Sequence, residues 1–188
     1  MSNLNSYSRI VIKIGSAVLA NAKGKIDHGF LARLAEDVAW LKGRNKDVLI
    51  VSSGAIALGR KNIALSKDLT LAESQALAAH GQIELMIAWK KHMNKYGIHI
   101  GQMLLTPRDT ELKVSAKNAQ QTIAKLLEVE CRPIINENDS TATDEIKFGD
   151  NDLLAAKIST LFQADLLIVL SSVDGLYASE ADSKDPAN

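Results

Sequence analysis

The alternation of short apolar runs with longer segments of helical period constrains this fold more than any other feature. Apolar runs such as residues 10–14 and 166–170 predict strands that are buried on both faces. Between such runs lie segments whose apolar residues recur every three or four positions, which predicts helices. Buried strands separated by helices are typical of a parallel sheet with a helical layer on each side. We therefore expect an α/β protein, a three-layer sandwich with a mainly parallel central sheet.

The individual elements follow from the same patterns. Strands are expected over residues 10–14, 48–51, 98–105, 133–135 and 166–170. Helices are expected between Asp27 and Gly43, from about residue 55, over residues 118–128 and over residues 151–162. Residues 70–96 are rich in helix formers but contain Gly81, so either one interrupted helix or two consecutive helices are expected. The small polar residues 178–188 are expected to fray.

Length and charge set the class of protein. A chain of 188 residues can bury a sizeable core, and we expect one domain over residues 1–188. The 22 basic and 22 acidic residues give a formal net charge of zero, so no global field attracts nucleic acid or an anionic membrane. The single cysteine, Cys131, excludes an intramolecular disulfide and favours a reducing compartment. No signal peptide or membrane span is visible, and we expect a cytoplasmic protein.

Two expected strands run directly into turns that contain glycine. Lys13 ends the first apolar run and Gly15 follows it. Ligands of open α/β sheets bind at the carboxyl ends of strands, so Lys13 either meets an anion there or extends to the rim of the sheet. Ser53 and Gly54 similarly lie between the second strand and a helix, whose first N–H groups attract carboxylates and phosphates. The simpler alternative is that Ser53 caps this helix.

An acidic segment precedes the last expected helix. Residues 135–152 contain six carboxylates and one lysine. Such a cluster can bind a substrate ammonium, position lysines or help to organise Mg²⁺ with phosphate oxygens, and the alternative is a solvated acidic loop. Asp152, near a helix N-terminus, also fits a purely structural role beside the helix dipole. No spacing of residues singles out a dedicated metal site, and we predict none.

Taken in order, these motifs resemble the amino-acid kinase superfamily, with its carbamate kinase-like fold. Within it they resemble most the members that phosphorylate glutamate. The resemblance is carried by residues 11–16, 52–57, 96–106, 135–139 and 148–152, which are spread over almost the whole chain. It implies phosphoryl transfer from MgATP to the side-chain carboxylate of glutamate, the first step of proline synthesis, and therefore ATP and Mg²⁺ as cofactors.

The resemblance also assigns roles on the substrate side of the expected site. Lys13 matches a residue that contacts the transferring phosphoryl group, and Asp152 matches one that orients catalytic lysines. Ser53, Asp139 and Asn151 match positions that hold glutamate. These residue types suit the ligand, because an amino acid needs an acidic acceptor for its ammonium and neutral donors for its carboxylates.

On the nucleotide side the resemblance assigns Lys13, Gly15, Ser171 and Ser172 to ATP. Ser172 stands where the family commonly has an aspartate. Family members continue through a glycine-rich nucleotide segment and often a PUA module, and neither is present in this sequence. We therefore expect this chain to be the glutamate-binding, N-terminal part of such a kinase domain, with the fold incomplete at its C-terminus.

Alternatives and partners follow from the same resemblance. The family usually forms homo-oligomers and is inhibited by proline, so both are expected here, alongside binding of L-glutamate and ATP. Nucleic acid and membrane are not expected partners. Two alternatives stay open: a catalytically impaired amino-acid-binding or regulatory subunit, and a kinase of another acidic amino acid such as acetylglutamate or aspartate.

Overall fold

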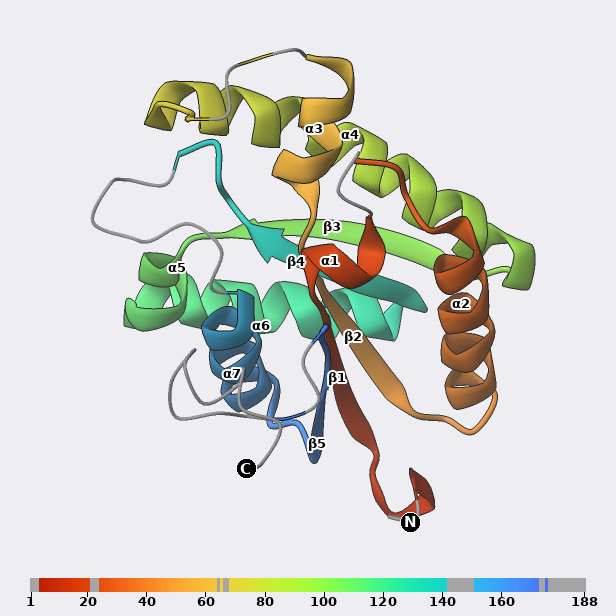
Figure 1. Ribbon diagram of the computed structural model, residues 1–188. Helices are drawn as coiled ribbons and strands as arrows, with labels where there is room; N and C mark the ends of the chain where they lie inside the picture. Colours follow the sequence, from red (N-terminus) through yellow and green to blue (C-terminus); the bar gives the residue numbers. More distant parts are fainter. Residues whose placement is uncertain are drawn as a thin grey trace.

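The computed structural model describes residues 4–20, 24–63, 65, 68–141, 151–172 and 175. Its described strands form one parallel sheet in the order β3-β4-β2-β1-β5 (Figure 1). They are β1 (Arg9–Ile14), β2 (Asp47–Ser52), β3 (His99–Leu105), β4 (Cys131–Glu137) and β5 (Leu166–Leu170). All five expected strands are confirmed, with β4 longer at both ends than the sequence predicts. β1 lies between β2, the next strand along the chain, and β5, the last described strand, so the first strand is an inner strand of the sheet.

Helices cover both faces of this sheet, which confirms the three-layer α/β prediction (Figure 1). They are α1 (Ser16–Leu19), α2 (His28–Lys42), α3 (Ala55–Asn62), α4 (Leu71–Met93), α5 (Pro107–Glu111), α6 (Lys113–Glu128) and α7 (Asn151–Phe162), with short 3₁₀ turns η1 (Leu4–Ser6) and η2 (Asn94–Tyr96). The first core contains Ile10, Ile12 and Ile14 packed with α2 and α4. The second contains Val11 packed with α6 and α7. The strand period of two thus decides which core each side chain enters.

The region around Gly81 is one continuous helix, α4, so neither an interruption nor a second helix is present. Thr70 caps the start of α4, and Glu73 completes a capping box. A Cβ atom at Gly81 would collide with the carbonyl oxygen of Ala55 on α3. The glycine therefore serves close approach of two helix backbones rather than a break in one helix.

Several smaller predictions need correction or lie outside the described residues. α6 begins at Lys113, five residues earlier than the sequence predicts, and the short helices α1 and α5 were not expected. Both helices are only about one turn long, which is too short for hydrophobic periodicity to reveal them. The predicted fraying of residues 178–188 lies outside the described part of the chain.

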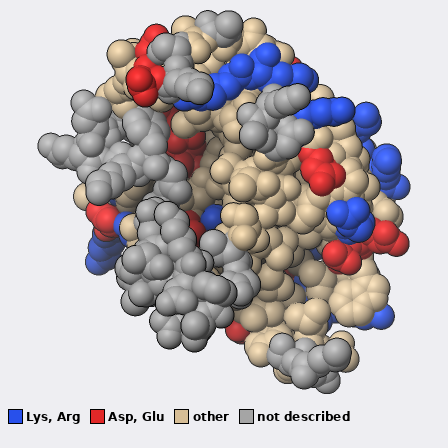
Figure 2. All heavy atoms as spheres, in the orientation of Figure 1, with Lys and Arg blue, Asp and Glu red and all other residues tan. Residues whose placement is uncertain are grey.

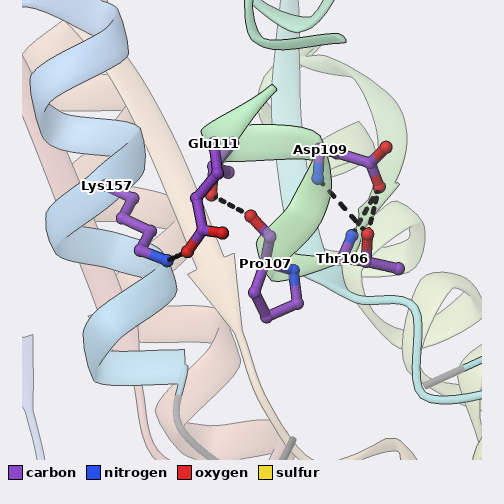
Figure 3. Close-up of polar contacts among 6 residues, drawn as sticks. Thr106, Pro107, Asp109, Glu111 and Lys157 are labelled. Carbon is purple, nitrogen blue, oxygen red and sulfur yellow. Dashed lines mark hydrogen bonds and ion pairs between the residues drawn. The ribbon is translucent and has the colours of Figure 1, made fainter. Parts of the chain in front are cut away.

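Helix α7 is held beside α5 by an ion pair (Figure 3). Thr106 and Asp109 form the capping box that starts α5, with the Thr106 N–H donating to the Asp109 carboxylate over 2.7 Å. At the other end of α5, Glu111 accepts from Lys157 of α7 over 2.6 Å. A largely exposed pair contributes little to stability, but it fixes the direction of the helix whose first residues enter the site.

No helix in the described ranges is long and apolar enough to cross a membrane.

Cys131, at the start of β4, is half-buried and has a free thiol. Burial raises the pKa of this thiol above its usual value, which keeps it protonated and unreactive.

Candidate functional site

The carboxyl ends of the strands bring together segments that are far apart in sequence. Ile14 is paired with Ser52 on one side and with Leu170 on the other, and Val51 is paired with Ile135. The residues that follow these strands therefore meet at one edge of the sheet, where ligands of open α/β sheets bind. Figure 2 shows this face as spheres, with acidic and basic atoms in a recess near its middle as well as around the periphery.

Lys13 meets an anion at this edge. It follows Val11 on the α7 side of β1, because alternate residues of a strand point to the same face. Its Nζ lies 2.7 Å from Oδ1 of Asp152, in the first turn of α7. The lysine side chain is only 7% exposed, whereas the aspartate side chain is 62% exposed. Of the two interpretations of Lys13, anion contact is therefore confirmed, and the anion is a carboxylate of the same chain.

Gly15 lies next to this ion pair. A Cβ at position 15 would be 3.7 Å from Lys13 Nζ and 3.4 Å from the carbonyl oxygen of Leu170. A side chain at position 15 would therefore lie in van der Waals contact with the lysine ammonium. The Gly15 N–H donates to Leu170 O over 2.9 Å, so this N–H belongs to the junction between β1 and β5.

Buried amides form a chain of hydrogen bonds beside the ion pair. Asn151, the first residue of α7, donates through Nδ2 to Ser53 Oγ over 2.8 Å and to Asn136 Oδ1 over 3.1 Å. Asn136 in turn donates through its own Nδ2 to Gln82 Oε1 over 2.8 Å. Its Oδ1 also accepts from the Glu137 N–H. Asn151, Asn136 and Gln82 are all buried, so this chain is a fixed part of the fold.

Ser53 is not the cap of helix α3. The N-cap is Gly54, with φ +112°, and a Cβ there would be 2.8 Å from Leu19 Cδ2. The Ser53 hydroxyl instead accepts from Asn151, and its backbone N–H donates to Ile14 O. The capping alternative for Ser53 is therefore wrong. Because the hydroxyl oxygen accepts from Asn151, its proton stays available to donate to a ligand.

Asp139 follows β4 at the same edge of the sheet. Its side chain is half-buried, and burial raises the pKa of its carboxyl from the usual 3.8 to about 6. The physical cause is the loss of water around the ionised form. A cation placed beside this carboxylate would recover part of that lost solvation energy, so the position favours a positively charged ligand.

The remaining predicted residues lie on the other side of Lys13. Ser171 and Ser172 follow β5 and are both exposed. Ser171 is close to Gly15, since a Cβ on that glycine would be 3.9 Å from Ser171 Cα. Neither serine joins the chain of buried amides.

Most of the acidic segment, residues 142–150, lies outside the described residues. Among the described residues, no three His, Cys, Asp or Glu side chains lie close enough together to hold a metal.

Sequence reasoning missed Gln82 and Asn136 as site residues. Gln82 shares the buried face of α4 with Ala78, Leu85 and Trp89. A glutamine at a core position of an amphipathic helix is a signal that could have found it, because a buried amide needs hydrogen-bond partners.

Comparisons with known proteins agree with this geometry. The model of the amino acid kinase family matches residues 8–187. A glutamate 5-kinase of Nitrobacter hamburgensis is 51% identical over 177 residues, which is 93% of this chain and 47% of that protein. Glutamate 5-kinases of Rhodopseudomonas palustris and Bradyrhizobium diazoefficiens are 50% and 51% identical, over 98% and 93% of this chain and 50% and 47% of theirs. The chain thus spans about half the length of the curated relatives it matches.

Proposed function

This chain belongs to the amino acid kinase family, and from that premise we propose that it is the glutamate-binding part of a cytoplasmic glutamate 5-kinase. The reaction is ATP-dependent phosphorylation of the γ-carboxylate of L-glutamate. The observation that carries the proposal is the ion pair between the buried Lys13 and the exposed Asp152, beside the hydrogen-bonded chain of Asn151, Asn136 and Ser53. The relatives named glutamate 5-kinase support the choice of substrate.

The atoms left unused in the amide chain fit an amino acid. Both hydrogens of Asn151 Nδ2 are engaged, so the atom that Asn151 can offer is its acceptor Oδ1, a buried atom with no partner in the described part of the chain. We assign this oxygen and the Asp139 carboxylate, both acceptors, to the ammonium of glutamate. The Ser53 hydroxyl proton is the matching donor for a carboxylate.

Lys13 is the catalytic residue of the proposal. A γ-carboxylate oxygen of glutamate attacks the terminal phosphorus of ATP, the bond from that phosphorus to the bridging oxygen breaks, and ADP leaves. The Lys13 ammonium offsets negative charge on the transferring phosphoryl group. Asp152 is a positioning residue, since it holds Lys13 Nζ at 2.7 Å and contacts no reacting atom. Gly15, Ser171 and Ser172 lie on the side of Lys13 that we assign to ATP.

Magnesium enters the proposal with the nucleotide. Mg²⁺ in phosphoryl-transfer sites is held by phosphate oxygens, water and one or two carboxylates. Asp152, mostly exposed and already beside Lys13, fits the role of such a carboxylate. When bound, the ion supplies positive charge to the phosphate oxygens.

Calorimetric titration of the chain with L-glutamate tests the binding half of the proposal. We expect saturable binding of L-glutamate and weaker binding of D-glutamate, because D-glutamate cannot place its ammonium and both carboxylates against Asp139, Ser53 and Lys13 in the same way. No binding of L-glutamate would refute the proposal. The same proposal includes inhibition by proline and self-association. Proline added to the titration should compete with L-glutamate, and size-exclusion chromatography should show a homo-oligomer.

Hydroxylamine trapping of acyl phosphate tests the reaction. With MgATP we expect the hydroxamate of L-glutamate, and a preference for L-aspartate or N-acetylglutamate would overturn the substrate assignment. A chain that binds L-glutamate but forms no hydroxamate would identify an amino-acid-binding subunit instead of a kinase.

A further inference from the structure

Gln82 lies on α4, away from the strand ends that carry the site, yet it is the last residue of the amide chain. We infer that Gln82 is a positioning residue, which acts through its side-chain oxygen to orient Asn136 and Asn151 for binding of glutamate. The inference rests on the proposed function of the site. It adds a residue from the middle of helix α4 to a set that otherwise lies at strand ends and in the first turn of α7.

The direction of each hydrogen bond carries the argument. Gln82 Oε1 accepts from Asn136 Nδ2, and the Glu137 N–H donates to Asn136 Oδ1, so these two bonds together fix which way the Asn136 amide faces. Asn136 must then present Oδ1 to Asn151, which donates to it through Nδ2. Asn151 is thereby left with Oδ1 as its free acceptor. Without the Gln82 oxygen, a flip of the Asn136 amide would place two NH₂ groups against each other and reverse the polarity offered to the ligand.

The backbone beside Gln82 is fixed as well. A Cβ at Gly81 would collide with Ala55 O, so α4 touches the first turn of α3 at this point. Helix α3 begins two residues after Ser53, which accepts from Asn151 at the opposite end of the amide chain. One helix contact therefore holds both ends of the chain at a constant separation.

The unused half of the Gln82 amide supports the same conclusion. Gln82 Nε2 is a buried donor with no partner in the described residues. A buried unsatisfied donor destabilises a fold, and a methionine of similar shape would avoid that cost. What a methionine could not provide is the acceptor for Asn136 Nδ2. The glutamine is therefore explained by its oxygen and its neutrality.

Two substitutions separate the oxygen from the nitrogen. Gln82→Met removes both, whereas Gln82→Glu keeps an oxygen facing Asn136 and replaces the unused nitrogen with a second oxygen, in a carboxyl group that burial favours in its protonated, neutral form. Titration with L-glutamate should show Kd raised about tenfold by Gln82→Met and within about threefold of wild type for Gln82→Glu. Gln121→Met, on the exposed side of α6, is the matched control and should change nothing. Unchanged binding by Gln82→Met, or equal losses in both Gln82 variants, would overturn the inference.

A second readout needs no ligand. The side-chain amide resonances of Asn136 and Asn151 in ¹⁵N NMR spectra should shift in Gln82→Met and stay near their wild-type positions in Gln82→Glu. Wild-type protein that fails to bind L-glutamate would refute the proposed function, while these resonances would still decide whether Gln82 orients the two asparagines. If Gln82→Met does not fold, the Gln82→Glu variant still decides, because loss of binding of about tenfold or more there contradicts a role of the oxygen alone.

Discussion

The two flanks of Lys13 differ in how completely they are built. On the substrate flank, formed by Ser53, Gln82, Asn136 and Asn151, polar side chains hold one another in fixed orientations. On the β5 flank, Ser171 and Ser172 are exposed, and β5 itself is only partly buried, with Val169 47% exposed. The comparison teaches that the polar groups we assign to glutamate are already held in place within the described residues, whereas the side that we assign to the nucleotide is an exposed surface.

The largest effect should come from breaking the helix contact behind the substrate flank. Gly81→Ala places a Cβ against the Ala55 carbonyl, and backbone atoms cannot move aside cheaply. We expect the free energy of unfolding to fall by about 3 kcal/mol or more, with loss of glutamate binding. Urea denaturation measures the change.

Gly97→Ala is the matched control for that experiment. Gly97 has φ +64°, and a Cβ at this position would meet no other atom within 4 Å, so only backbone strain opposes an alanine there. The expected loss is about 1 kcal/mol, and glutamate binding should persist. Equal losses at both glycines would show that the helix contact is not what supports the substrate flank.

The next largest effect is expected for Asp139→Asn, which should weaken glutamate binding on the same flank without lowering stability. Asp139→Asn removes the carboxylate that we assign to the ligand ammonium, so the Kd for L-glutamate should rise about 30- to 100-fold. The melting temperature should not fall, because the substitution also removes a half-buried charge whose burial is unfavourable. Asp37→Asn, on the exposed side of α2, should change neither quantity. A lower melting temperature with unchanged Kd would contradict the assignment.

The raised pKa of Asp139 predicts how glutamate binding and stability of the substrate flank depend on pH. Ligand binding requires the ionised carboxylate, so affinity for L-glutamate should fall by up to about tenfold per pH unit below the pKa of about 6. The free energy of unfolding should instead increase as the pH falls. The folded protein binds this proton more tightly than the unfolded chain, so the Asp139 contribution to stability increases as pH falls from 6 towards 4. Titrations at several pH values, with Asp139→Asn as the variant that should lose both trends, measure this.

The smallest effect compares one serine from each flank. Ser53→Ala removes a hydroxyl from the amide chain and should raise the Kd for L-glutamate about fivefold. Ser172→Ala removes an exposed hydroxyl on the β5 flank and should change that Kd by less than about twofold. Titration of both variants tests whether the two flanks differ in their contribution to glutamate binding. Equal losses of affinity would show that they do not.

Sequence patterns predicted the frame of the site because that frame depends on local rules. Apolar runs locate the strands, and parallel pairing then brings the residues after them to one edge. The alternation along β1 places Lys13 on the side of Val11, where α7 packs. The resemblance to a family supplied Asp152 as its partner, and the structure brings the two together.

The parts that escaped prediction depend on packing between distant segments. Periodicity predicts a possible break at Gly81, but the role of this glycine is set by α3, which packs against α4 from another part of the chain. The partner of Gln82 is equally hard to predict from sequence, because Asn136 is 54 residues away. The alternative role of Ser53 as a helix cap failed for the same reason, since Asn151 competes for the hydroxyl from 98 residues away.

The place of β1 between β2 and β5 has a consequence for the order in which the sheet can assemble. Arg9–Ile14 emerges before the other strands during synthesis, yet one of its two neighbours in the sheet is Leu166–Leu170, and Asp165 accepts from the N–H groups of Ser8 and Arg9. A nascent chain that ends after β4 already contains Gln82 and Asn136 but lacks Asp152 to neutralise Lys13. The Lys13 ammonium therefore lacks this partner until α7 has left the ribosome, and closure of the sheet beside it must wait for β5.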